Sequence, residues 1–379
     1  YAEMLEADGE SDLAFRQRNL GREAGRFREA DDPWLAELHQ WCYDPKRLAL
    51  LGTAAYQTRR GDRGVSFLQR ALHLAPEDPA AYLALGTLHL QLGEPAKAQP
   101  VLEEGLRLPG RGHDHVMLAV NLAEALRPQR RSDEALRVIQ EALKDSPTAY
   151  ELHSELGALL VDLGRIEESV KAYRQAVALV PDDADSNFSL GSNLLALGQR
   201  EEAMRYLKRS LTLQPTYPKT LILLGHLALE AGQLEEAARY WQPLYDSHPE
   251  QATARHLLAL YHLRAGEAAA AKKDFNAADQ HYRKGLAIEP DYAEIHASLG
   301  VSSLVQNRPQ DALSPFEAFH RLRPKDAQSS LFLGQVYAQL GRIPDARKIL
   351  AEGEDLAQRA GNRETAGYCR EILDHLPPL

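Results

Sequence analysis

The sequence predicts an all-α protein, a solenoid of antiparallel helical hairpins, and two observations lead to this fold class. The chain repeats itself at a spacing of 34 residues, so that "ELGALLVDLGRIEESVKAYRQAVALVPDD" (155–183) is followed by "SLGSNLLALGQREEAMRYLKRSLTLQPTY" (189–217). Within each copy, Leu, small residues, Gly and Pro recur at fixed offsets. A single hairpin cannot bury its own apolar face, so neighbouring copies have to cover it.

Residues 1–44 are expected to form a partial repeat and a spacer helix. The first 21 residues fit the repeat pattern if Tyr1 is its seventh position and Gly9 its fifteenth. The chain would then begin in the middle of a helix, and we expect it to continue from a longer upstream polypeptide or to be a processed product. The alternative is a charged helix that fits the pattern by chance.

The spacer helix is predicted from "DDPWLAELHQWCYD" at residues 31–44. Trp34, Leu38 and Trp41 lie on one apolar stripe, and an acidic residue before Pro33 can cap the helix. This stripe predicts a buried helix ahead of the regular repeats.

Nine tandem repeats follow between residues 45 and 360, each expected to contain a helix A and a helix B. The seventh residue of every repeat is Leu, and the eighth and twentieth are Gly, Ala or Ser. Helices with axes about 8 to 10 Å apart leave room for little more than a methyl group at their closest point, so the two helices should meet at these small residues. The repeats begin at Pro45, Pro79, Val116, Tyr150, Ala184, Pro218, Ala252, Ala293 and Ala327.

Glycine and proline mark the ends of the two helices. Several repeats have glycine at the fifteenth position, and one has Asn307 there, which suits the left-handed residue that ends helix A. These glycines are Gly93, Gly164, Gly198, Gly232 and Gly341. Proline ends helix B because it lacks a backbone donor and disfavours helix in the residue before it. These prolines are Pro76, Pro147, Pro181, Pro215, Pro249, Pro290 and Pro324.

Two insertions interrupt the spacing. Residues 113–115 separate the second and third repeats, and we expect them to lie in a loop. The seventh repeat carries extra residues near 264–277, which amount to about two helical turns. A longer, protruding hairpin is therefore predicted at about 263–279.

Residues 361–379 are expected to form a capping helix. Ala366, Cys369 and Ile372 lie on one side of "NRETAGYCREILDHL", and charged residues lie on the other. The last repeat of an array has no neighbour and needs such an element with a polar outer face.

The pattern of Leu, Gly, Ala and Pro resembles the tetratricopeptide repeat family from about residue 45 to 360, although the usual aromatic residue at the fourth position is kept only as Tyr82. The resemblance implies a right-handed superhelix whose concave face is lined by the A helices. It says little about function, because many unrelated proteins use this scaffold.

By the same resemblance, positions two, five, nine and twelve of each repeat line the concave groove. Most of them are small, aliphatic or uncharged, which suits an extended or helical peptide; packing between A helices is their alternative role. The Lys and Asn clamp for a C-terminal carboxylate is missing, and so is an asparagine ladder, since Asn121 is alone at the sixth position. The predicted partner-binding residues are Tyr56, Leu83, Thr87, Glu124, Ser154, Phe188, Ser192, Ile222, His226, His256 and Gln335.

Composition and motifs argue against several classes of function. The net charge of −10 argues against a general nucleic-acid or anionic-membrane surface, and no apolar run is long enough for direct membrane insertion. The two cysteines, Cys42 and Cys369, exclude a disulfide framework. His113 and His115 lack a third metal ligand, and Trp241 is expected in the core. Without HExxH, P-loop, GxSxG or Rossmann motifs, we expect no catalysis, metal or cofactor.

The first functional hypothesis is a non-catalytic scaffold or adaptor that docks a protein or peptide partner. The alternative is the docking arm of a larger bacterial redox or transferase protein, because residues 31–48 resemble the linker of arrays fused to multihaem c-type cytochromes. No CxxCH motif is present, so such an activity would lie upstream or on a redox partner. Self-assembly is a third hypothesis. The excess of Arg over Lys favours a bacterial source, and the compartment stays open.

Overall fold

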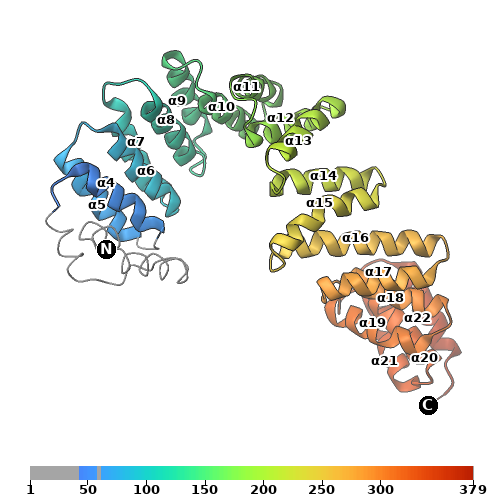
Figure 1. Cartoon of the computed structure of the whole chain (residues 1–379). Helices are drawn as coiled ribbons and strands as arrows, with labels where there is room; N and C mark the ends of the chain where they lie inside the picture. Colours follow the sequence, from blue (N-terminus) through green and yellow to red (C-terminus); the bar gives the residue numbers. More distant parts are fainter. Residues whose placement is uncertain (1–41, 58–60, 379) are drawn as a thin grey trace, which may run out of the picture. The chain divides into compact units, whose positions relative to one another are not determined.

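The computed structural model describes residues 42–57 and 61–378, and these residues contain nineteen helices and no strands (Figure 1). The predicted all-α class of antiparallel helical hairpins is confirmed. The helices belong to two compact units, Tyr1–Val180 and Pro181–Leu379. The partial repeat and the spacer helix predicted before residue 42 lie outside the described residues.

The described part of unit 1 contains four hairpins, in each of which a helix A packs against the helix B that follows it. Its helices are α4 (Pro45–Gln57), α5 (Gly61–Leu74), α6 (Pro79–Gln91), α7 (Pro95–Arg107), α8 (His113–Leu126), α9 (Ser132–Asp145), α10 (Tyr150–Asp162) and α11 (Ile166–Leu179).

Unit 2 contains five hairpins and a final helix. Its helices are α12 (Ala184–Ala196), α13 (Arg200–Leu213), α14 (Pro218–Glu230), α15 (Leu234–Ser247), α16 (Ala252–Ala271), α17 (Phe275–Ile288), α18 (Ala293–Val305), α19 (Pro309–Leu322), α20 (Ala327–Gln339), α21 (Ile343–Arg359) and α22 (Arg363–His375). None of the helices described in either unit is long and apolar enough to cross a membrane.

The small residue at the eighth position of helix A receives a large side chain from helix B. A Cβ atom added to Gly157 would lie 2.6 Å from Cε2 of Tyr173, sixteen residues later in the chain. Gly225 holds the indole of Trp241 in the same way, and Trp241 is fully buried, as the sequence predicted. Most hairpins therefore close by placing a bulky side chain over a glycine; the α8–α9 hairpin has Ala123 at this position.

The turn between the two helices has the backbone conformation that the sequence predicted. Gly164 has a φ of +72°, and Asn307, which replaces glycine, has a φ of +56°. Arg130 and Lys273 adopt the same left-handed conformation at the corresponding turns of the third and seventh repeats. A side chain is thus accepted there, at the cost of some backbone strain.

The insertion at residues 113–115 is helical, so the loop prediction was wrong. Helix α8 begins at His113 instead of Val116, and Nε2 of His115 lies 3.0 Å from the carbonyl oxygen of Leu108. Gly112, with a φ of +126°, makes the turn that lets the helix begin early. Because no breaker separates His113 from the helix that follows, the added residues extend its first turn.

The extra residues of the seventh repeat all belong to helix A. Helix α16 has 20 residues, whereas α14 has 13, and α17 keeps the 14 residues of α15. Gly266 faces the ring of Tyr282, so the hairpin closes seven residues later than the predicted small residue Ala259 would place it. The first turns of α16 pack on the previous repeat through Ala254 and Leu257. One helix is therefore extended, where a longer hairpin of two helices was expected.

The last helix, α22, packs against α21 and α20. Its Cys369 is fully buried beside Leu331 and Leu350, and burial raises the pKa of its thiol to about 11. Ile372 and Leu373 pack against the same cluster, as expected of the apolar side of a capping helix.

Candidate functional site

Three neighbouring A helices of unit 1 present a continuous set of half-buried or exposed side chains. Helix α6 packs against α8, and α8 packs against α10. We call this set the A-helix strip, and it contains four of the predicted partner-binding residues. Its members are Leu83 and Thr87 on α6, Val120 and Glu124 on α8, and Ser154 and Ala158 on α10.

A buried hydrogen bond fixes the first two helices of the strip. Nδ2 of Asn121 donates to Oγ1 of Thr87 at 2.7 Å, and this hydroxyl donates to the carbonyl oxygen of Leu83 at 2.7 Å. Asn121 is buried, so its amide belongs to the helix interface and not to a ladder that binds a ligand. Thr87 is both a strip residue and a structural acceptor.

The charged end of the strip contains Arg127, which follows α8, and two carboxylates of α10. Nε of Arg127 donates to Oδ2 of Asp162 at 2.6 Å, and this hydrogen bond raises the pKa of the guanidinium. Its Nη1 lies 3.7 Å from Oε1 of Glu155, which is too long for a hydrogen bond. Arg127 is therefore held mainly by Asp162.

Glu155 is half-buried, and one of its oxygens is buried without a hydrogen-bond donor. Its side chain is 13% exposed, and Oε1 is buried and has no hydrogen-bond partner. Burial raises the pKa of this carboxyl to about 7; Arg127 opposes the rise, and Glu124 and Asp162 add to it. The carboxyl therefore keeps a proton to a higher pH than an exposed glutamate does.

The sequence prediction included Glu124 but missed Glu155. A signal was present, because Glu155 is the only ionisable residue at the sixth position of the nine repeats. The other repeats have Leu50, Ala84, Asn121, Ser189, Leu223, Leu257, Ser298 and Phe332 there.

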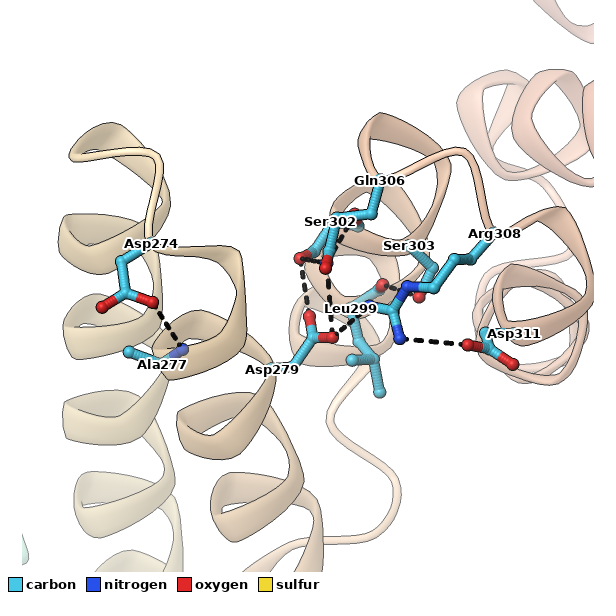
Figure 2. Close-up of polar contacts among 9 residues, drawn as sticks. All are labelled: Asp274, Ala277, Asp279, Leu299, Ser302, Ser303, Gln306, Arg308 and Asp311. Carbon is cyan, nitrogen blue, oxygen red and sulfur yellow. Dashed lines mark hydrogen bonds and ion pairs between the residues drawn. The ribbon is translucent and has the colours of Figure 1, made fainter.

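Unit 2 has a buried carboxylate in a different setting, shown in Figure 2. The side chain of Asp279 on α17 is 7% exposed. It accepts hydrogen bonds from Oγ of Ser302 at 2.6 Å, Nη2 of Arg308 at 2.6 Å and Nε2 of Gln306 at 3.4 Å. Both of its oxygens have donors, and they fasten α17 to the next hairpin.

The predicted aromatic residues of unit 2 pack against other rings of the same unit. Phe188 meets Tyr217 edge to face with ring centroids 5.7 Å apart, and His226 meets Trp241 at 5.3 Å. His256 stacks on Tyr292 at 5.0 Å, and its Nδ1 lies 3.2 Å from Oε2 of Glu289. Ser192, Ile222 and Gln335 are half-buried on three separate A helices, and the side chain of Tyr56 lies outside the described part.

A hollow of about 710 Å³ lies beside α18, α19 and the start of α20 and is lined by Ala297, Phe319 and Arg323, among others. The ion pair between Arg323 and Glu294, at 2.9 Å, involves two of its lining residues. A second hollow of about 440 Å³ lies next to His115 and Arg111 in unit 1. Neither hollow contains an unpaired buried polar atom comparable to that of Glu155.

Two histidines form the closest contact between imidazoles among the described residues. Nδ1 of His262 on α16 lies 3.2 Å from Nδ1 of His281 on α17. Burial lowers the pKa of His262 to about 4, with His281 and Lys284 contributing, and burial also lowers the pKa of His281. In the described ranges, no group of three or more His, Cys, Asp or Glu side chains is arranged to hold a metal ion.

Comparison with known protein families gives matches along most of the chain. Models described as tetratricopeptide repeat match residues 55–108, 83–150, 120–168, 194–261, 259–292 and 298–361. A model described as TPR repeat matches residues 157–195. The match at 259–292 begins inside α16, so that Gly266 is its eighth residue. Among curated proteins, none matches this sequence.

Several solved structures are similar to this chain. PilF of Pseudomonas aeruginosa is 19% identical, covers 57% of this chain and 96% of its own, and has a TM-score of 0.48. YrrB, described as a TPR protein with an unusual peptide-binding site, is 19% identical, covers 51% and 97%, and has a TM-score of 0.37. Cut9–Hcn1 of the APC/C is 18% identical, covers 73% and 52%, and has a TM-score of 0.42. Given the family matches and the stacked hairpins, the chain belongs to the tetratricopeptide repeat family.

Proposed function

We propose that this protein is a non-catalytic scaffold that binds a peptide segment of a partner protein on the A-helix strip of unit 1. Repeats of this family support protein interaction in general, and the choice of this strip is the step added here. The observation that carries it is the arrangement of Leu83, Val120 and Ala158, which are only half-buried on three A helices packed side by side.

The chemistry of the strip suits a peptide with spaced apolar side chains. Leu83, Val120 and Ala158 offer shallow apolar contacts, and Ser154 offers a hydroxyl one turn before Ala158 on α10. The strip is supported from below by a continuous core that includes Leu118, Leu122 and Leu152. A rigid surface of this kind loses little conformational entropy when a peptide binds, which favours affinity.

Peptides selected from a random library displayed on phage, with the full chain as the target, test this proposal. Ser154→Tyr should fill the strip and reduce the binding of the selected peptides at least tenfold. Gln140→Tyr, which adds the same ring at an exposed position of α9, should leave binding unchanged. Peptides that bind both variants as well as the unmodified chain would show that the strip is not the binding surface.

The docking arm of a larger redox or transferase protein and the self-assembly module stay predictions. The intact mass of the native polypeptide, with covalent groups retained, tests the first, because covalent haem adds a defined mass. Sedimentation at increasing protein concentration tests the second.

A further inference from the structure

The charged end of the A-helix strip has an excess of negative charge. Glu124, Glu155 and Asp162 provide three carboxyl groups, and Arg127 provides one guanidinium. Arg127 is hydrogen-bonded to Asp162 and lies 3.7 Å from Glu155, so a single guanidinium is shared among these carboxyl groups and makes no hydrogen bond to Glu155.

An unpartnered carboxyl oxygen beneath a surface is costly. A buried acceptor without a donor loses its hydration and gains no hydrogen bond in return. Native proteins contain few such groups, and each one calls for an explanation. Asp279 shows that this fold can satisfy a buried carboxylate fully when the group serves only to join repeats.

From this contrast we propose that Glu155, together with Glu124, binds the cationic side chain of a Lys or Arg residue in the partner peptide. The inference rests on the proposed function and names the chemistry of the ligand. The apolar part of the cationic side chain would lie along Val120 and Ala158, and its charged end would reach the two carboxylates. A charge-assisted hydrogen bond in a partly desolvated site is about twice as strong as a neutral one.

The groups that face Glu155 allow for this role. Glu124 and Arg127 face it from α8 and the residue that follows, Asp162 faces it from its own helix, and Tyr173 of α11 lies near Arg127. A second cation near Glu155 would favour its ionised form. Binding should therefore displace the proton that the free carboxyl carries part of the time at pH 7.

The test uses the phage-selected peptides and carboxamide variants of the full chain. The selected peptides should be enriched in Lys or Arg at one position, and replacing that residue with Gln should weaken binding about tenfold to a hundredfold. Glu155→Gln and Glu124→Gln should each weaken the binding of the cationic peptide. Neither variant should change the binding of the peptide in which Gln replaces the cationic residue. Glu168→Gln, which makes the same change of charge on the outward residue of α11, is the matched control.

Calorimetry in two buffers with different ionisation enthalpies gives a second readout. The unmodified chain should release a fraction of a proton when the cationic peptide binds at pH 7, and Glu155→Gln should release none. The inference would be overturned if peptides whose binding is reduced by Ser154→Tyr show no enrichment in Lys or Arg, or bind Glu155→Gln and Glu124→Gln normally. Either outcome would leave the proposed function standing. If Ser154→Tyr also has no effect, both proposals fail.

Discussion

Two buried carboxylates, one in each unit, show how the same group can serve different purposes. Asp279 in unit 2 is surrounded by a hydroxyl, an amide and a guanidinium that it binds at hydrogen-bond distance (Figure 2). Glu155 in unit 1 has a guanidinium only at 3.7 Å and one oxygen without a donor. The first carboxylate joins repeats through its hydrogen bonds, whereas the second keeps one oxygen without a hydrogen bond, which is the basis of the proposed cation site.

The largest effect is expected when the committed carboxylate is removed. Asp279→Ala should destabilise unit 2 by about 3 kcal/mol, because it leaves Arg308 and Ser302 without their common partner. The shift in the midpoint of urea denaturation measures this loss. Asp311→Asn removes the more exposed partner of Arg308 and should change stability by less than about 0.5 kcal/mol. Equal effects of the two variants would show that the buried site is no stronger than a surface ion pair.

Glu155→Gln should stabilise the protein, whereas Asp279→Ala should destabilise it. Burial raises the pKa of Glu155 above its unfolded value, so the group is accommodated best when protonated, and its cost grows as the pH rises through about 7. The variant should therefore be more stable than the unmodified chain by about 2 kcal/mol at pH 9 and equal to it near pH 4. Thermal unfolding across this pH range measures the difference. A pH-independent difference would mean that Glu155 is not strained by burial.

The pair of His262 and His281 should make unit 2 less stable as the pH falls. Glu155 has the opposite effect in unit 1, where its cost to stability grows as the pH rises. The pKa values of His262 and His281 are lowered in the folded state, so the unfolded chain binds protons first as the pH falls below about 6.5. The free energy of unfolding therefore falls as the pH is lowered from about 6.5 to the pKa of His262, which is about 4. His262→Phe should remove about 1 kcal/mol of this loss, measured by urea denaturation at pH 7 and pH 4.5. His153→Phe is the control, at a histidine of unit 1 whose ring is bonded to the carbonyl oxygen of Pro147. It should leave the loss of stability between pH 7 and pH 4.5 unchanged.

Much of the fold could be predicted because its signals are local. Helices α10 and α12 begin at Tyr150 and Ala184, as the spacing predicted, since proline ends the preceding helix B within a few residues. The helical start at His113 and the closure at Gly266 were missed for a common reason. An insertion can be absorbed before or after the point where two helices cross, and only packing decides between them.

The candidate site could be predicted only in part. Family positions led to Leu83, Thr87, Glu124 and Ser154, which do lie on neighbouring helices. The state of Glu155 depends on how far the adjacent repeat removes water from it and on the fact that Arg127 turns to Asp162. Both are properties of the packed array, and no single repeat contains them.

The pairing of a glycine with a bulky side chain sixteen residues later has a consequence for how such arrays can be rearranged. Gly157 with Tyr173, and Gly225 with Trp241, each close a hairpin inside one stretch of chain. Recombination that exchanges whole hairpins keeps the glycine of helix A together with its bulky partner on helix B. A crossover at the turn between the two helices separates them. The repeat array should therefore tolerate the exchange of complete hairpins far better than the exchange of single helices. The hairpin is the segment that recombination can exchange.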